Sequence, residues 1–259
     1  WVDYVISQSP GYLWNTGWHY GDWLFYSVNN DNAGNSAVTY TPLVQQCFFA
    51  NSATIMSKTA EVLGKEKDAA YYADVARKVK EAFCENYLTP AGMLVSSTQT
   101  AYVLALNFDM LPENMRSKAA AHLAANVEKY GHITTGFLGT PYICHVLTEF
   151  GYNDLAYKLL LREQYPGWLY PVTMGATTIW ERWNSMMPDR TIPDNGMNSF
   201  NHYSYGAIGD WLYRDAVGLH ETSAGFKTMA IKPHPGADFT QMRAEQMTPY
   251  GRAAAEWRK

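Results

Sequence analysis

Helix-length segments joined by short loops fill the middle of the chain and limit its fold more than any other feature. Apolar or small side chains recur every three or four residues in each segment, which predicts amphipathic helices. Glycine or proline stands at most segment ends, where helices stop or start. Successive helices should form antiparallel hairpins, because the loops between them are short. The predicted helices cover residues 43–63, 66–87, 98–111, 112–129, 141–150 and 154–164.

The hairpins differ from one another in sequence, which favours a toroid of helix pairs over a solenoid with a consensus repeat. The helical period breaks at residues 175–183, where β-branched Thr177, Thr178 and Ile179 favour an extended stretch. A final helix is predicted over 198–217. Residues 226–232 then read as a strand bounded by proline, at the start of a β domain.

The composition is that of an ordinary globular protein, with 17% charged residues, 47% hydrophobic residues and a net charge of −4. No clustered basic face indicates nucleic-acid binding, and the apolar runs are shorter than a membrane span. The first residues show no signal-peptide pattern, and the missing initiator methionine predicts a piece of a longer protein. Three widely spaced cysteines are expected to be buried thiols, because no pair has metal-ligand spacing.

A single acid, Glu181, stands between Trp180 and the Arg182-Trp183 pair. Aromatic faces shield the apolar side of a pyranose ring, and a carboxylate beside them can move protons. Aromatic residues make up 15% of the chain, which agrees with a carbohydrate site, but composition alone favours an aromatic-rich helical core. The alternative for Glu181 is a structural ion pair with Arg182 or another cation.

Two motifs resemble those of the bacterial α-L-rhamnosidases of glycoside hydrolase family 78. Residues 177–181, Thr-Thr-Ile-Trp-Glu, resemble one family motif, and residues 198–203, Asn-Ser-Phe-Asn-His-Tyr, resemble the helix that follows it. The order of these two motifs along the chain and the spacing between them also agree with those of the family. Further family segments are similar to residues 1–4, 20–24, 98–102 and 135–140, so the resemblance covers nearly the whole chain.

The resemblance implies a mainly α fold. Residues 1–218 would be the later part of an (α/α)6 catalytic barrel of antiparallel helix hairpins, and residues 219–259 the incomplete start of a small β-sandwich domain. It also implies an inverting hydrolase, without cofactor or metal, that removes terminal α-L-rhamnose from glycosides or polysaccharides. The family's general acid lies in an Asp-Glu-Arg-type motif on an earlier part of the barrel, and this chain has no such motif. The remainder of the same polypeptide is therefore expected to be needed for activity.

The resemblance assigns four site residues. Glu181 would be the general base, His202 would hydrogen-bond the sugar, Trp23 would pack on a sugar face, and Asp22 would accept a hydroxyl hydrogen bond. Their structural alternatives are an ion pair for Glu181, a satisfied histidine for His202, core packing for Trp23, and a turn residue for Asp22. Trp180 and Trp183 would either wall the site or point into the core.

Two other functions stay open at the level of sequence. One is an (α/α)6-barrel hydrolase or lyase that acts on another sugar. The other is a non-catalytic carbohydrate-binding remnant that keeps the aromatic cleft without the acid. An acidic motif upstream of residue 1 in the complete polypeptide would favour the enzyme over the remnant.

Overall fold

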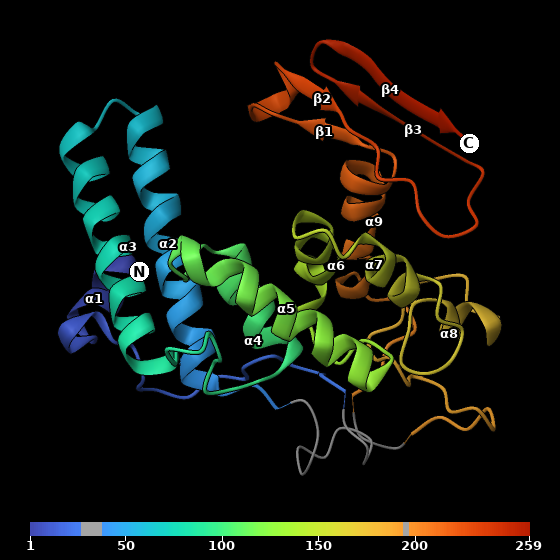
Figure 1. Ribbon diagram of the computed structural model, residues 1–259, viewed down its shortest axis with the longest axis horizontal. Coiled ribbons are helices and arrows are strands. Elements are labelled where there is room, and N and C mark those ends of the chain that lie inside the picture. The colour runs from blue at the N-terminus through green and yellow to red at the C-terminus, as the bar shows by residue number, and fades with distance from the viewer. Residues whose placement is uncertain (27–37, 194–196) are drawn as a thin grey trace. The chain divides into compact units, whose positions relative to one another are not determined.

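The computed structural model describes residues 1–26, 38–193 and 197–259, which form two compact units (Figure 1). The first unit comprises Trp1–Tyr130 and the short segment Thr134–Gly139. The second comprises Gly131–Ile133 and Thr140–Lys259. Helices make up most of the regular structure of the first unit, whereas the second combines helices with two β-hairpins.

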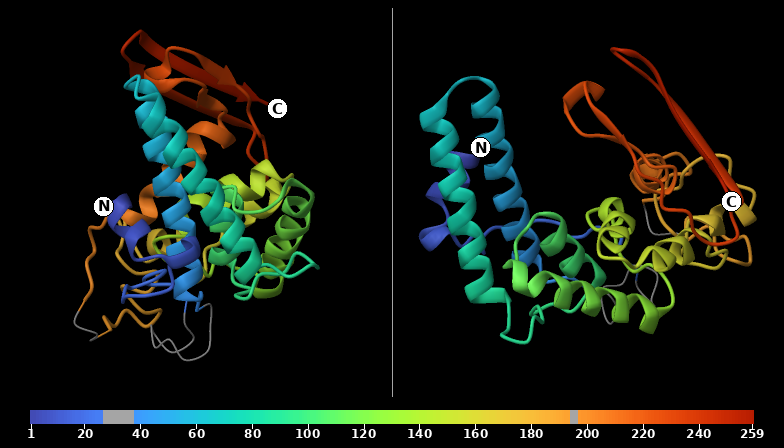
Figure 2. Two further views of the ribbon diagram at one scale, coloured as in Figure 1. Left: turned by 90° about the vertical axis from the view of Figure 1, so that its left-hand side faces the viewer. Right: turned by 45° about the horizontal axis from the view of Figure 1, so that its top comes forward.

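Antiparallel helices build the first unit, and its longest pair lies side by side in every view (Figures 1 and 2). This pair, α2 and α3, turns at Gly64, whose φ of +67° suits glycine, and the Lys65 amide there donates to the carbonyl of Ala60 at 2.8 Å. The α-helices are α1 (Val2–Ser7), α2 (Thr41–Val62), α3 (Glu66–Tyr87), α4 (Gln99–Asn107) and α5 (Glu113–Tyr130).

Helix α4 is the most deeply buried element of the first unit. Residues 99–106 are all buried, so this helix has no solvent face. It packs against α5 and α2. The hydroxyl of Thr98 caps its first turn by accepting a hydrogen bond from the Ala101 amide. Helix α4 ends at Asn107, earlier than predicted, because the chain turns at Asp109 with a φ of +54°.

A buried tryptophan of α9 packs against α6 and α7 in the second unit. The ring of Trp211 meets that of Tyr157 edge-on at 5.0 Å, and its Nε1 donates to the Thr148 hydroxyl at 2.9 Å. The helices are α6 (Thr140–Glu149), α7 (Asn153–Leu160), α8 (Leu169–Thr173) and α9 (Ile208–Trp211); 3-10 turns lie at Ser204–Ala207 and Ala224–Phe226, and a π turn at Leu212–Ala216.

The final helix differs from its prediction over residues 198–217. Helical structure begins only at Ser204, and it continues as the 3-10 turn, α9 and the π turn. Residues 199–202 instead pair with the extended segment 179–181 through the backbone. The predicted strand over 226–232 is also shorter, because residues 224–226 form a 3-10 turn.

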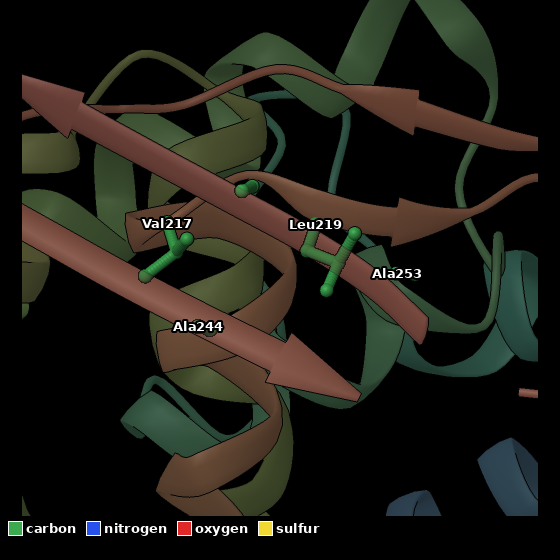
Figure 3. Close-up of a cluster of buried hydrophobic side chains, with 5 residues drawn as sticks. Val217, Leu219, Ala244 and Ala253 are labelled. Atoms are coloured by element: carbon green, nitrogen blue, oxygen red, sulfur yellow. The ribbon is translucent and has the colours of Figure 1, made fainter. Parts of the chain in front are cut away.

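Two antiparallel hairpins follow the last helix. Strand β1 (Leu219–Glu221) pairs with β2 (Met229–Ile231), and β3 (Gln241–Thr248) pairs with β4 (Gly251–Arg258). Alternate residues of β4 point inward and join a cluster of buried side chains (Figure 3). The indole Nε1 of Trp257 donates to the Ala216 carbonyl, which ties this hairpin to the end of the helices. The cluster consists of Val217, Leu219, Ala244, Ala253 and Ala255.

The predicted fold class is therefore confirmed: the chain is mainly helical, and its helices precede a small part with antiparallel strands. Cys47 and Cys144 are buried as expected, whereas Cys84 is only half-buried. Within the described ranges, no helix combines the length and the apolar character that crossing a membrane requires.

Candidate active site

Two segments twenty residues apart meet in the second unit and form the frame of the candidate site. The Glu181 amide donates to the Ser199 carbonyl at 2.9 Å, and the His202 amide donates to the Ile179 carbonyl at 2.8 Å. The Thr178 hydroxyl donates to the carbonyl of Phe200. Because these bonds fix the register, His202 is tied to the same short stretch of backbone that carries Glu181.

Glu181 is largely buried, with 9% of its surface exposed. The neighbouring rings are buried more deeply. Trp180 meets Phe200 edge-on at 5.3 Å, and Trp183 stacks on Tyr205 at 3.8 Å with 15° between the planes. Both tryptophans therefore contribute to packing, as the core alternative predicted, while they also hold the backbone on each side of Glu181.

Arg182, the next residue in the chain, is buried at 4% exposure. Burial lowers the pKa of its guanidinium, and its Nε donates to the Met197 carbonyl at 2.6 Å. Among the residues that the structure describes, the ion pairs of the second unit lie elsewhere and none uses Glu181. These contacts speak against the structural ion pair that was the alternative for Glu181.

His202 is half-buried, and its ring stacks on that of Tyr203 at 5.1 Å with 15° between the planes. Its Nδ1 accepts a weak hydrogen bond from the Ser204 amide at 3.3 Å. Tyr203 itself is 86% exposed, so this aromatic pair is open to solvent. His202 therefore has the accessibility that hydrogen bonding to a sugar would require.

Asp22 lies in the first unit and is 3% exposed. Its Oδ2 accepts from the Thr100 hydroxyl at 2.5 Å and the Gly136 amide at 2.8 Å; its Oδ1 accepts from the amides of Leu138 at 2.8 Å and Gly139 at 3.2 Å. Burial raises the pKa of this carboxyl, although the four hydrogen bonds act in the opposite direction. Hydrogen bonding of Asp22 to a sugar stays a prediction, and these contacts favour a structural role.

The neighbouring Trp23 belongs to an aromatic group that includes exposed rings. Its ring meets Tyr20 edge-on at 4.9 Å, and Tyr20 meets Trp18 edge-on at 4.5 Å. Trp18 is 78% exposed and Tyr20 is 64% exposed. The Trp23 carbonyl accepts from the Phe137 amide at 2.9 Å. Trp23 belongs to the first unit and Glu181 to the second, so their convergence on one sugar stays a prediction.

A small pocket lies against the frame that carries Glu181. Trp180 and Arg182, the two neighbours of Glu181 in sequence, both line it, and its volume is about 40 Å³. Helix α8 supplies Pro171 and Val172, and Ala176 follows that helix on the same side. The predicted set of site residues did not include α8 or this pocket.

A histidine held between two carboxylates joins three elements of the second unit. His145 on α6 places Nδ1 2.6 Å from Asp215 and Nε2 3.1 Å from Asp210. Burial acts to lower the pKa of His145, but the hydrogen bonds and charges of the two aspartates outweigh it and raise the pKa to about 9. These partners lie 65 and 70 residues away from His145 in the sequence.

In the part of the chain that the structure describes, no group of three or more His, Cys, Asp or Glu side chains is arranged so that it could hold a metal ion. The second unit instead carries a largely buried acid, Glu181, which is flanked in sequence by two buried tryptophans and lies on an extended segment.

Comparisons with known proteins give the family. The model of the bacterial α-L-rhamnosidase six-hairpin glycosidase domain matches residues 1–216, and that of the bacterial α-L-rhamnosidase C-terminal domain matches residues 218–259. An α-L-rhamnosidase of Formosa agariphila is 44% identical over 242 residues, which cover 92% of this chain and 26% of that protein.

Solved structures agree with this match. The α-L-rhamnosidase of Streptomyces avermitilis, solved in complex with L-rhamnose, aligns with a TM-score of 0.92 and 38% identity over 100% of this chain and 24% of its own. The native enzyme of Aspergillus terreus aligns with a TM-score of 0.89 and 32% identity over 95% of this chain and 29% of its own. The chain thus belongs to the bacterial α-L-rhamnosidase family, and it spans about a quarter of the length of the relatives that it matches.

Proposed function

We propose that this chain is the later part of the catalytic domain of an α-L-rhamnosidase, with residues 219–259 as the beginning of its C-terminal β domain. The complete protein would hydrolyse terminal α-L-rhamnose from glycosides or polysaccharides with inversion at the anomeric carbon. The observation that carries the proposal is the backbone pairing of 179–181 with 199–202, which joins the segment that carries Glu181 to the segment that carries His202.

Glu181 would act as the general base in this mechanism. Its carboxylate would take a proton from a water molecule, whose oxygen attacks the anomeric carbon while an acid on the other side of the ring protonates the leaving oxygen. Inversion needs room for that water, so the two carboxyl groups should lie roughly 6.5–9.5 Å apart. No acid with the family's motif is present in this chain, so the acid would come from the rest of the polypeptide.

His202 and Trp23 would bind the sugar. An imidazole can hydrogen-bond a hydroxyl group, and an indole ring packs on the apolar face of a pyranose. The contacts of Asp22 support a different contribution: its carboxylate would hold the segment 134–139 against the backbone that carries Trp23. Asp22 would then act through Trp23 and not through the substrate.

The test is Glu181→Gln in the full-length protein. The amide keeps the shape of the side chain but cannot accept the proton, so turnover of an aryl α-L-rhamnoside should fall by about two to four orders of magnitude while KM changes much less. Glu163→Gln makes the same chemical change at an exposed position of the same unit and serves as the control.

The product anomer is followed by NMR during the same assay. Release of the inverted anomer with the expected loss in the Gln variant would support the proposal. Near-normal turnover in that variant would remove Glu181 from the mechanism, and retained configuration would make it a nucleophile. A full-length protein that binds rhamnose but never releases it from a glycoside would favour the non-catalytic remnant.

A further inference from the structure

A groove in the second unit lies where the last helix meets the β-hairpins (Figure 1). Helix α9, the π turn that follows it and strands β1 and β3 all contribute lining residues, whereas Glu181 and His202 do not line it. Its volume is about 480 Å³. Binding pockets for small molecules measure about 300–1,000 Å³, and a cavity of about 150 Å³ accommodates benzene. The groove therefore has room for one or two six-membered rings with their substituents.

Two aromatic side chains line this groove, and both belong to unusual stretches of backbone. Tyr213 lies in the π turn, a helical form that occurs frequently at functional sites. Phe226 has a φ of +60°, a left-handed conformation that is rare for a bulky residue and costs free energy. Phe226 also packs against the buried cluster of Figure 3. The Tyr213 ring is 41% exposed, and within the described ranges no other aromatic ring packs on it, so it can receive a ligand.

The charged groups of the groove balance one another. Each of the three carboxylates that line it has a cationic group of the protein within 3.8 Å. An anionic ligand would face three carboxylates, and a cationic ligand would compete with groups that already neutralise them. A neutral ligand avoids both costs and gives up no charge hydration. The pairs are Asp210 with His145, Glu221 with Arg214, and Glu245 with both Arg243 and Arg252.

The polar groups of the groove keep hydrogen-bonding capacity for a ligand. Arg214 lies 3.9 Å from Asp210 and 3.8 Å from Glu221, which is longer than a hydrogen bond, so its N–H groups can still donate. Within the described ranges, the Tyr213 hydroxyl and the side-chain amide of Gln246 make no hydrogen bond to the protein. Each of these two groups can both donate and accept. A sugar hydroxyl also donates and accepts, so it matches this mixture of groups.

We propose that this groove is a second sugar-binding site, which binds one or two neutral pyranose units of a glycan without cleaving them. The Tyr213 ring would pack on the apolar face of a pyranose, while Arg214, Glu221 and Gln246 would hydrogen-bond its hydroxyl groups. The inference goes beyond the proposed function, because binding here requires neither Glu181 nor the acid on the rest of the polypeptide.

Hydrogen exchange of the full-length protein locates the binding. The probes are L-rhamnose, methyl β-D-galactoside and methyl β-D-glucoside, each at a concentration that saturates its effect. At least one of them should slow exchange in peptides that cover 208–216 and 241–248, because these segments line the groove. Binding at the candidate active site would instead slow exchange over 179–202. If no probe protects the groove peptides, for instance because the rest of the polypeptide covers them, the proposal is overturned.

Substitutions in the groove test the contacts. Tyr213→Ala removes the ring and should weaken binding of the protecting probe, measured by calorimetry, by at least about fivefold, whereas Tyr213→Phe should keep it within about twofold. Gly209 lines the groove, and a Cβ there would have no heavy atom within 4 Å, so Gly209→Leu should fit the fold and block the groove. Tyr250→Ala removes an exposed ring of the same unit outside the groove and serves as the control. Equal affinity in the Tyr213→Ala and Tyr250→Ala variants would refute the site.

Ligand charge and turnover provide the remaining outcomes. Affinity for the neutral probe should change by less than about twofold between about 0.05 and about 0.5 M NaCl. Tighter, salt-dependent binding of D-glucosamine would make the groove a cation site and overturn the proposal. Tyr213→Ala should leave kcat/KM for an aryl α-L-rhamnoside unchanged; a parallel loss would make the groove part of the active site instead. Normal turnover in the Glu181→Gln variant would refute the proposed base, while the exchange and calorimetric results for the groove would stand.

Discussion

The substitution Asp22→Asn should locally destabilise the segment 134–139, whose amides bind the Asp22 carboxylate. The native carboxylate accepts four hydrogen bonds, from the Thr100 hydroxyl and from the amides of Gly136, Leu138 and Gly139. An asparagine has one acceptor oxygen and one donor nitrogen in the same space. Its nitrogen should turn toward Thr100, since a hydroxyl can accept as well as donate whereas a backbone amide cannot.

The Gly136 amide then loses its acceptor while it remains buried, and the Leu138 and Gly139 amides keep theirs. A buried donor without a partner costs about 1–3 kcal/mol, so we expect about 2 kcal/mol in local stability. Since 1.36 kcal/mol corresponds to a factor of ten, the opening equilibrium of the segment 134–139 should rise by about thirtyfold. Regions far from this segment should be affected much less.

Hydrogen exchange of the full-length protein, followed by mass spectrometry, measures the opening equilibrium of the segment 134–139 directly. Peptides that contain residues 134–139 should exchange about thirtyfold faster in the variant. Asp68→Asn makes the same chemical change at an exposed position of the first unit and should leave these peptides unaffected. If exchange of this segment changes less than threefold in the Asp22 variant, the carboxylate is not what holds the segment in place.

Two other sites give predictions in the second unit. The pKa of His145, raised to about 9 by Asp210 and Asp215, lies above the usual unfolded value near 6.5; the stability it contributes is therefore complete below about pH 6.5 and lost as pH rises through 9. Urea titrations of the full-length protein should show this decline, and His145→Gln should flatten it; an equally steep decline in the variant would refute the assignment. Gly218→Ala should lower the thermal midpoint by several degrees, because a Cβ there would lie 2.2 Å from the backbone nitrogen of Pro233 and φ is +84°. An unchanged thermal midpoint would mean that the backbone around Gly218 and Pro233 can shift to accept the Cβ at little cost.

The helical part of the fold could be predicted from the sequence because local pattern decides it. Apolar spacing and terminal glycines define α2 and α3, which follow the predicted ranges closely. Residues 198–203 were predicted as helix and are not, because their backbone pairs with 179–181 across a loop. A partner so distant in sequence leaves no periodic signal in the segment itself.

Prediction of the candidate site from the sequence is limited in the same way, because contacts between distant segments leave no local signal. Glu181 could be singled out from its neighbours in sequence, but the deep burial of Asp22 depends on amides more than 110 residues away. The two aspartates that bind His145, Asp210 and Asp215, likewise come from elements far from it in the sequence. Residue type predicts what chemistry a side chain can perform, while exposure and available partners are settled only when distant segments pack.

The segment Thr134–Gly139 has a consequence for the order in which the chain acquires its structure. It belongs to the first unit, although residues on both sides of it belong to the second. During synthesis, which proceeds at about 5–20 residues per second, Asp22 must therefore wait about 6–23 seconds for partners that lie up to 117 positions later. Until residues 134–139 have been made, Asp22 lacks three of its four hydrogen-bond donors and the helices α2 to α5 lack the last piece of their unit, so a ribosome that pauses near residue 130 would present an unfinished surface to chaperones.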